Sequence, residues 1–326
     1  MKRLMRYRIW LIVLLVLSVT GAYLFSTLQA EPDPKMRIIC ILKTTERNGF
    51  WNSLTEGIEA AMEEYDADVR ITGPDEESDV EQQNKIIRDA VAEKPDVIVL
   101  AAIDSNLTMP AALEVKQAGI KLVLIDSGLK DHIEDAMVGT DNNRAGVRAG
   151  ALIQRLMGKD GKLGIISFVR NSLTAIDREE GLKSAVGEDN SNVYDTVYCD
   201  SDEQRAFELT TQLLNEHPDI TVLAGLDQYS SAGAARAVAQ LGLSGRVKVV
   251  GFDNSKEQIK YLEEGIYEGL VIQKAFNMGY LGIEAAVELA QGGHVPMNRD
   301  SGSVLVTKDN MYIGIYQKLL FPFQEE

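Results

Sequence analysis

The amino-acid sequence predicts an α/β protein built from two doubly wound parallel-sheet lobes. From residue 36 onward, short apolar runs alternate with segments of helical periodicity. The runs are continuous in Val, Ile and Leu, which is typical of strands buried on both faces of a parallel sheet. They are too many for one comfortable sheet, and they fall into two sets of similar order that divide near Thr140–Asp141. The sequence therefore predicts two lobes that face each other.

The first set of runs predicts the strands of the first lobe. They cover residues 37–43, 69–72, 96–102, 121–127 and 137–141. Helical stripes lie between them: Leu54, Ile58, Ala61 and Met62 share one helix face, and Ile86, Ile87, Ala90 and Val91 share another. Gly119 follows the helix before the fourth strand, where a helix commonly ends.

The second set predicts the strands of the second lobe. They cover residues 162–169, 196–200, 220–227, 247–253 and 269–273. Gly242 and Gly292 end two of the predicted helices. Because ligands of open α/β sheets bind outside the carboxyl ends of the strands, the residues that follow these strands are the candidate site.

The N-terminus predicts export. A basic head precedes Ile9–Phe25, a stretch of 17 mostly apolar residues. Residues 1–30 are therefore interpreted as a signal peptide or a membrane anchor. Both alternatives stay open, but we favour the anchor because Leu28 is large where a cleavage site needs a small residue. No cysteine follows the apolar run, so the sequence offers no lipoprotein site, and residues 31–35 form a Pro-containing linker.

Composition limits the partners. The net charge of −16 disfavours nucleic acid and anionic lipid surfaces as partners of the exported part. Export permits a disulfide between the two cysteines, Cys40 and Cys199. Both lie in apolar, strand-like segments, so we expect buried reduced thiols.

Polar side chains follow the predicted strands. Asp104, Asp126, Asp227, Asp253 and Gln273 stand at strand ends, and Thr44 and Asn48 follow the first strand. Carboxylates and amides at one edge suit the hydroxyl groups of a ligand. The alternative is that these Asp residues cap the next helix, and we prefer this alternative for Asp104. We expect Asp126 to have no partner within the protein.

Two adjacent aromatic residues, Phe50 and Trp51, begin the first helix at the same rim. A sugar has polar edges and an apolar C–H face, so an aromatic ring beside carboxylates favours a sugar-like ligand. The alternative is that one or both rings pack into the core.

The sequence carries no motif of a known catalytic centre. Its three histidines are scattered without metal-ligand spacing, and no P-loop, GxSxG or HExxH segment occurs. Paired carboxylates also occur in glycosidases, but no feature of the sequence singles out a raised carboxyl pKa. We therefore expect no enzyme activity and no cofactor or metal.

Residues 36–308 resemble the ribose/galactose-type periplasmic sugar-binding proteins, whose fold is shared by the sensor domains of LacI-type repressors. The stretches that carry the resemblance include "NGFWNSLTEGIEAA", "GIKLVLIDS", "VGTDNNRAGVRAG" and "LVIQKAFNMGYLGIEAA". The resemblance implies a periplasmic binding protein type I fold with a hinge of three crossings. It places residues 36–140 and 274–302 in the first lobe, and residues 141–273 and 303–326, with the C-terminal tail, in the second.

The resemblance also implies ligand contacts. They fall on Thr44, Asn48, Phe50, Trp51, Asp126, Asp227, Asp253 and Gln273. The sequence departs from ribose-type members at Ser127, where they carry arginine, and at Ser201, where they carry an aromatic residue. Phe168, Arg170 and Tyr229 are the candidates to replace that aromatic residue. The ligand is thus open among monosaccharides, polyols and furanosyl signal molecules.

These features predict an extracytoplasmic protein that captures a sugar-like small molecule and presents it to an ABC permease. A retained anchor keeps a second interpretation open, in which the protein is the ligand-sensing subunit of a membrane histidine kinase. A third interpretation, the effector domain of a repressor, is strongly disfavoured because an apolar segment, and no helix-turn-helix, precedes residue 36. The tail, residues 309–326, is expected to pack on a lobe.

Overall fold

The computed structural model describes Ser18, Thr20 and residues 35–46, 49–158, 160–187 and 191–321. The chain divides into two compact units, Met1–Lys35 and Met36–Glu326. The predicted signal or anchor segment and Asn48 lie outside the described residues, apart from Ser18 and Thr20. No helix that the described residues form is both long and apolar enough to cross a membrane.

The first sheet has six parallel strands in the order β11-β5-β4-β3-β1-β2. Its strands are β1 (Arg37–Ile41), β2 (Asp68–Thr72), β3 (Val97–Leu100), β4 (Lys121–Ile125), β5 (Ala136–Gly139) and β11 (Asn298–Asp300). All five strands predicted for this lobe are present. The prediction of strands buried on both faces is confirmed, because Val97 and Val99 pack into one core while Ile98 and Leu100 pack into another.

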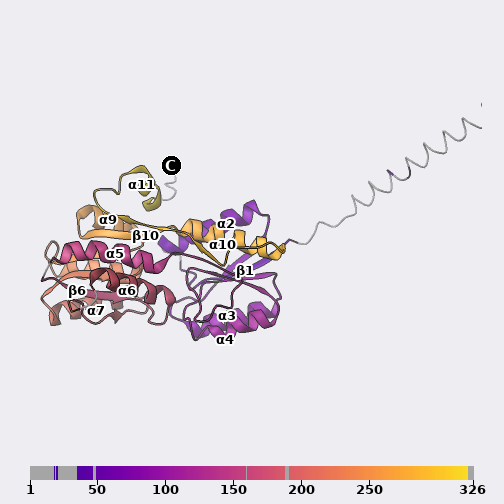
Figure 1. Ribbon diagram of the computed structural model, residues 1–326, viewed down its shortest axis with the longest axis horizontal. Coiled ribbons are helices and arrows are strands. Elements are labelled where there is room, and N and C mark those ends of the chain that lie inside the picture. The colour runs from indigo at the N-terminus through magenta and orange to yellow at the C-terminus, as the bar shows by residue number, and fades with distance from the viewer. Residues whose placement is uncertain are drawn as a thin grey trace, which may run out of the picture. The chain divides into compact units, whose positions relative to one another are not determined.

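Four helices cover the first sheet. They are α2 (Gly49–Glu64), α3 (Val80–Ala92), α4 (Met109–Gln117) and α10 (Ala275–Ala290). Helices α2 and α10 lie on one face, and α3 and α4 lie on the other (Figure 1). Gly57 and Gly279 permit the close approach of α2 and α10, because a Cβ at either position would lie 2.0 Å from a carbonyl oxygen of the facing helix.

The second sheet also has six strands, in the order β12-β10-β9-β8-β6-β7, and only β12 runs antiparallel to its neighbour. The strands are β6 (Lys162–Ser167), β7 (Val197–Tyr198), β8 (Ile220–Gly225), β9 (Lys248–Phe252), β10 (Tyr267–Gln273) and β12 (Ser303–Val306). The helices of this lobe are α5 (Asn142–Met157), α6 (Leu173–Val186), α7 (Glu203–Glu216), α8 (Gln228–Gln240), α9 (Lys256–Glu264) and α11 (Gly314–Leu320). The predicted fold class of two α/β lobes is confirmed.

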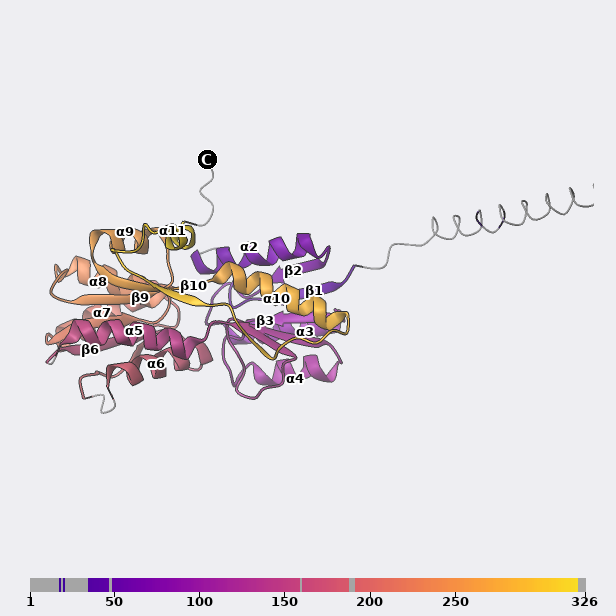
Figure 2. The ribbon, with the colours of Figure 1, turned by 45° about the horizontal axis from the view of Figure 1, so that its top comes forward.

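The chain passes between the two sheets three times. It leaves the first sheet after β5 and enters the second lobe at α5, returns from β10 to α10, and crosses again from β11 to β12. Figure 2 shows β10 leading directly toward α10. These short connections hold the carboxyl ends of both sets of parallel strands near the junction of the lobes, which positions the candidate site.

Three local predictions can be compared with the structure. Gly119, Gly242 and Gly292 have φ values of 76°, 66° and 78°, the left-handed conformation expected after a helix. Cys40 and Cys199 are buried and unpaired with each other, so the expectation of buried thiols is confirmed. The described part of the tail packs on the second lobe, since Met311 and Leu320 belong to its core.

Candidate ligand-binding cleft

The loops after the strands of both lobes meet in a small cleft. Its lining residues are Lys43, Phe50, Trp51, Glu77, Asp126, Phe168, Thr174, Arg178, Asp227, Gln228, Tyr229, Asp253 and Gln273. The free space is about 30 Å³, enough for one or two water molecules. A larger ligand therefore requires the lobes to separate or the lining side chains to move.

Asp126 and Lys43 form a buried ion pair at the first-lobe side of the cleft. Asp126 follows β4, Lys43 follows β1, and Lys43 Nζ lies 2.7 Å from Asp126 Oδ2, with side-chain exposures of only 3% and 5%. The expectation that Asp126 has no internal partner is therefore wrong. The physical reason is that a lysine buried at this depth needs a counter-ion, and Asp126 provides it.

Asp126 and Asp253 occupy matching positions in the two lobes. Asp126 follows β4, the fourth strand of the first lobe, and Asp253 follows β9, the fourth strand of the second. Both have φ of 61°, a left-handed conformation that Asp tolerates better than most residues. Both residues line the cleft, so the two lobes present one carboxylate each from equivalent turns.

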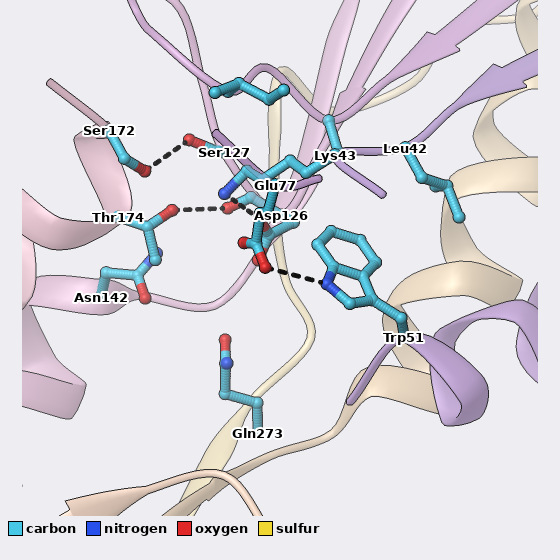
Figure 3. Close-up of polar contacts among 12 residues, drawn as sticks. Leu42, Lys43, Trp51, Glu77, Asp126, Ser127, Asn142, Ser172, Thr174 and Gln273 are labelled. Carbon is cyan, nitrogen blue, oxygen red and sulfur yellow. Dashed lines mark hydrogen bonds and ion pairs between the residues drawn. The ribbon is translucent and has the colours of Figure 1, made fainter. Parts of the chain in front are cut away.

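Phe50 and Trp51 both line the cleft. Their rings make an edge-to-face contact with centroids 5.0 Å apart and an interplanar angle of 84°. Trp51 is 3% exposed and also belongs to the first-lobe core. Its indole Nε1 donates a hydrogen bond of 3.3 Å to Glu77 Oε2 (Figure 3). Trp51 thus serves both the core and the cleft, which the sequence left as alternatives.

Asp253 and Gln273 form a hydrogen-bonded pair in the second lobe. Gln273 Nε2 donates to Asp253 Oδ1 at 2.7 Å, while Gln273 Oε1 has no hydrogen-bond partner among the described residues. Burial raises the pKa of Asp253 to about 6, although the positive charge of Arg178 acts in the opposite direction. The pair presents a carboxylate and an amide carbonyl to any molecule in the cleft.

Asp227 is both a helix cap and a lining residue. Its side chain accepts a hydrogen bond of 2.8 Å from Ser230 N at the start of α8, completing a capping box. Burial raises its pKa. The cap that the sequence offered as an alternative is therefore present, and it lies at the cleft because α8 begins there.

Arg178 is almost fully buried beneath the cleft. Its Nε donates to Asn142 Oδ1 at 2.9 Å, and its Nη1 donates to the carbonyl oxygen of Leu226 at 2.7 Å. The guanidinium lies 4.6 Å from the centre of the Phe252 ring, a cation–π distance. In the part of the chain that the structure describes, its Nη2 has no hydrogen-bond partner.

Direct hydrogen bonds join the two lobes around the cleft. Tyr229 Oη donates to Glu46 Oε2 at 2.8 Å, and Phe50 N donates to Gln228 Oε1 at 3.4 Å. On the other side, Thr174 Oγ1 donates to the carbonyl oxygen of Asp126 at 3.4 Å (Figure 3). The structure thus shows the lobes drawn together, which accounts for the small free volume.

Comparison with known proteins decides the family. Residues 38–294 match the family described as the periplasmic binding protein domain. The chain belongs to the periplasmic binding protein family. The D-ribose/D-allose-binding protein of Pseudomonas aeruginosa is 27% identical to this periplasmic binding protein over 313 residues, which cover 93% of this chain and 97% of that protein.

Solved structures of similar proteins share the fold. A sugar transporter from Clostridium phytofermentans is 47% identical, with a TM-score of 0.80 over 84% of this chain and 100% of that one. An ABC transporter solute-binding protein from Agrobacterium vitis, crystallised with bound D-fucose, is 29% identical, with a TM-score of 0.83 over 87% of this chain and 99% of that one. These similarities confirm the resemblance stated from the sequence.

One described residue among the predicted contacts of this periplasmic binding protein, Thr44, does not line the cleft. Thr44 is buried, and its hydroxyl donates to the carbonyl oxygen of Asp75 at 2.9 Å and accepts from Glu46 N at 3.0 Å. Asn48 lies outside the described residues. Asp104, preferred as a cap, accepts hydrogen bonds of 2.8 Å from Asn106 N and Leu107 N.

Other cleft residues were not among the predicted contacts. Glu77 follows β2 within "GPDEES", where nothing distinguishes it from the acidic residues beside it. Of the three candidates for the missing second-lobe aromatic residue, Phe168 and Tyr229 line the cleft, whereas Arg170 stacks 3.9 Å from the Tyr198 ring centre.

Among the described residues, no group of three His, Cys, Asp or Glu side chains is arranged to hold a metal ion.

Proposed function

We propose that this protein binds a sugar or sugar-like small molecule in the interlobe cleft and presents it to an ABC importer. The observation that carries the proposal is the facing arrangement of two kinds of group at one cleft. Asp253 and Gln273 offer hydrogen-bond acceptors, and the aromatic rings of Phe50, Trp51 and Phe168 lie at the same cleft. Hydroxyl groups suit the acceptors, and the C–H face of a sugar suits an aromatic ring.

The similar proteins support this proposal. They include a D-ribose/D-allose-binding protein, a ribose import binding protein of Escherichia coli and a solute-binding protein with bound D-fucose. Their names describe binding and import of monosaccharides. We therefore favour import over the sensory alternative, and we propose binding without catalysis, with no cofactor.

The ligand contacts are proposed as a set. Asp126, Asp227, Asp253 and Gln273 would accept hydrogen bonds from the ligand, and Phe50 and Trp51 would contact its C–H groups. Thr44 and Asn48 remain proposed contacts of the loop after β1. Phe168 and Tyr229 are added from the second lobe because they line the same cleft.

A ligand screen tests the function. Pentoses, hexoses and polyols are added singly to the purified protein, and the melting temperature is recorded. A ligand at one hundred times its dissociation constant stabilises the folded state by about 2.7 kcal/mol, and calorimetry then confirms the hit. We expect Asp253→Ala to remove the response and Asp219→Ala, on the far side of the second lobe, to keep it. A chain that responds to no sugar or polyol would contradict the proposal.

We also propose that residues 1–30 remain attached and hold the protein at the outer face of the cytoplasmic membrane. Leu28 disfavours cleavage after Ala30, and the basic residues before Ile9 favour a cytoplasmic N-terminus. Mass spectrometry of the natively expressed protein tests this proposal. A mature chain that starts at Glu31 would show a cleaved signal peptide instead.

A further inference from the structure

The cleft holds more carboxylates than cations. Its charged lining residues are Glu77, Asp126, Asp227, Asp253, Lys43 and Arg178. The Lys43 charge is matched by Asp126 in the buried ion pair. With every group ionised, the lining residues therefore carry two more negative than positive charges.

The excess charge has no direct counter-ion. Among the ion pairs of the described residues, none contains Glu77, Asp227 or Asp253. The guanidinium of Arg178 is held instead by the Asn142 side chain and a backbone carbonyl. The Asp227 carboxylate accepts its hydrogen bonds from the first turn of α8, which it caps. Glu77 and Asp253 thus remain as the carboxylates available to a ligand.

Glu77 is fixed in a defined orientation. The indole of Trp51 donates to its Oε2, and Figure 3 shows the Glu77 carboxylate and the Gln273 amide pointing toward one another across the cleft. Burial raises the pKa of Glu77 to about 8; the positive charge of Lys43 acts in the opposite direction, and the negative charges of Asp227 and Asp126 add to the rise. A carboxylate in this position is destabilised unless a donor or a positive charge meets it.

We propose that the ligand is an aminated monosaccharide or polyol whose protonated amine binds Glu77. The inference rests on the proposed function, since it specifies the class of sugar-like ligand that the cleft takes. Glu77 is half-buried at the closed cleft, where a carboxylate without a counter-ion is unfavourable. An ammonium group supplies both hydrogen-bond donors and a compensating charge. A neutral hydroxyl supplies one donor and no charge.

The test compares sugars that differ in one group. Glucose, galactose and mannose are each titrated beside their 2-amino and 6-amino forms, and beside the N-acetylated forms of these amines, by calorimetry at pH 6.5 and fixed ionic strength. We expect at least one amine to bind about tenfold or more tightly than its parent sugar. Acetylation keeps the nitrogen but removes the charge, so we expect it to abolish the gain.

Variants assign the effect to Glu77. Glu77→Gln keeps the side-chain shape but cannot give up a proton to pair with an ammonium, so we expect the preference for the amine to disappear while the neutral sugar binds equally well or better. Glu76→Gln is the matched control, because Glu76 is the exposed neighbour and does not line the cleft. Circular dichroism melts establish that both variants fold.

The outcomes are separable. If every parent sugar binds as tightly as its amines, the inference is overturned and the proposed sugar-binding function stands. A preference for the amine that survives Glu77→Gln also overturns it, because another group must then hold the ammonium. If none of these hexoses, amines or acetylated forms binds, the inference fails, and the screen with pentoses and polyols decides the proposed function separately.

Discussion

The hydroxyl of Tyr229 in the second lobe donates a hydrogen bond of 2.8 Å to Glu46 in the first lobe. Tyr229 belongs to the first turn of α8, and Glu46 lies in the loop between β1 and α2. The neighbouring residue, Gln228, accepts a bond from Phe50 N at the start of α2. The start of α8 therefore forms a direct latch with the β1–α2 loop and the first turn of α2, and its strength adds to the stability of the closed state.

Removal of the Tyr229 hydroxyl should weaken ligand binding. In Tyr229→Phe the ring remains but the bond to Glu46 is lost, and one such bond contributes about 0.5–1.5 kcal/mol. We expect about two- to tenfold weaker affinity, mainly through faster dissociation, because the closed complex opens more readily. Stopped-flow dissociation of a ligand found in the screen measures this change.

The control for the latch is Tyr194→Phe. Tyr194 also donates to a carboxylate, Asp219, but both residues belong to the second lobe. We expect its dissociation rate to match the wild-type rate. Equal rates for Tyr229→Phe and the wild type would show that the latch does not contribute to closure.

The Lys43–Asp126 pair should contribute to stability as well as to binding. Asp126→Ala leaves Lys43 buried without its counter-ion, and breaking a buried pair in this way costs about 3–5 kcal/mol. We expect a loss of that order in the free energy of unfolding of the ligand-free protein, measured by urea denaturation. Ligand affinity should fall in the same variant.

A second substitution separates the two effects. Lys43→Met with Asp126→Ala removes both charges, so most of the lost stability should return, while affinity should stay low. Glu114→Ala breaks the exposed pair with Arg88 and should cost less than about 1 kcal/mol. An Asp126→Ala protein as stable as the wild type would show that Lys43 finds another partner.

The raised carboxyl pKa values predict a pH dependence of stability. The pKa of Glu77 rises from 4.5 to about 8 and that of Asp253 from 3.8 to about 6. In this window the folded protein holds protons that the unfolded chain has released. These two groups therefore lower the free energy of unfolding as pH rises from about 4 to about 8.

Glu77→Gln tests this dependence by difference. The stability of the variant relative to wild type should increase steadily between pH 4.5 and pH 8, because the variant lacks the carboxylate whose ionisation is opposed. Urea denaturation at half-unit pH steps provides the values. Glu76→Gln serves as the control, since solvent surrounds that exposed side chain in both states. A difference that is flat with pH would place Glu77 in a well-solvated environment.

The elements of the fold could be predicted because their signals are local. Each buried strand is a continuous apolar run, and Gly119, Gly242 and Gly292 mark helix ends through their positive φ. The cleft residues Asp126 and Asp253 were also predictable, because both follow such strands and parallel strands bring their ends to one edge.

The partners of these residues could not be predicted from local signals. Lys43 meets Asp126 only because β1, β3 and β4 are neighbours in the sheet, and the strand order is not written in any short segment. Glu77 reaches the cleft because the loop after β2 folds back to Trp51. These contacts depend on packing between distant segments. The sequence therefore predicted the acceptors at the strand ends, but it predicted neither the ion pair between Lys43 and Asp126 nor the presence of the Glu77 carboxylate in the cleft.

The fluorescence of Trp51 should report ligand binding. The chain has two tryptophans, Trp10 and Trp51, so a protein that begins at Lys35 has one indole, and the body from Met36 onward forms its own compact unit. Trp51 is 3% exposed, lines the cleft and donates to Glu77. A ligand that binds Glu77 or displaces water beside the ring alters the polarity around the indole. We therefore expect a saturable emission shift with the ligand and none with a sugar that does not bind.

Calorimetry on the same protein tests whether the shift in Trp51 emission is caused by ligand binding. The midpoints of the heat and emission titrations should agree, because one event produces both signals. Glu77→Gln changes the partner of the indole Nε1 from a carboxylate to an amide, so its ligand-free emission should already differ from the wild type, whereas that of Glu76→Gln should not. Binding heat with constant emission would show that Trp51 senses only the first-lobe core, which would leave Phe50 as the first-lobe aromatic residue in contact with the ligand.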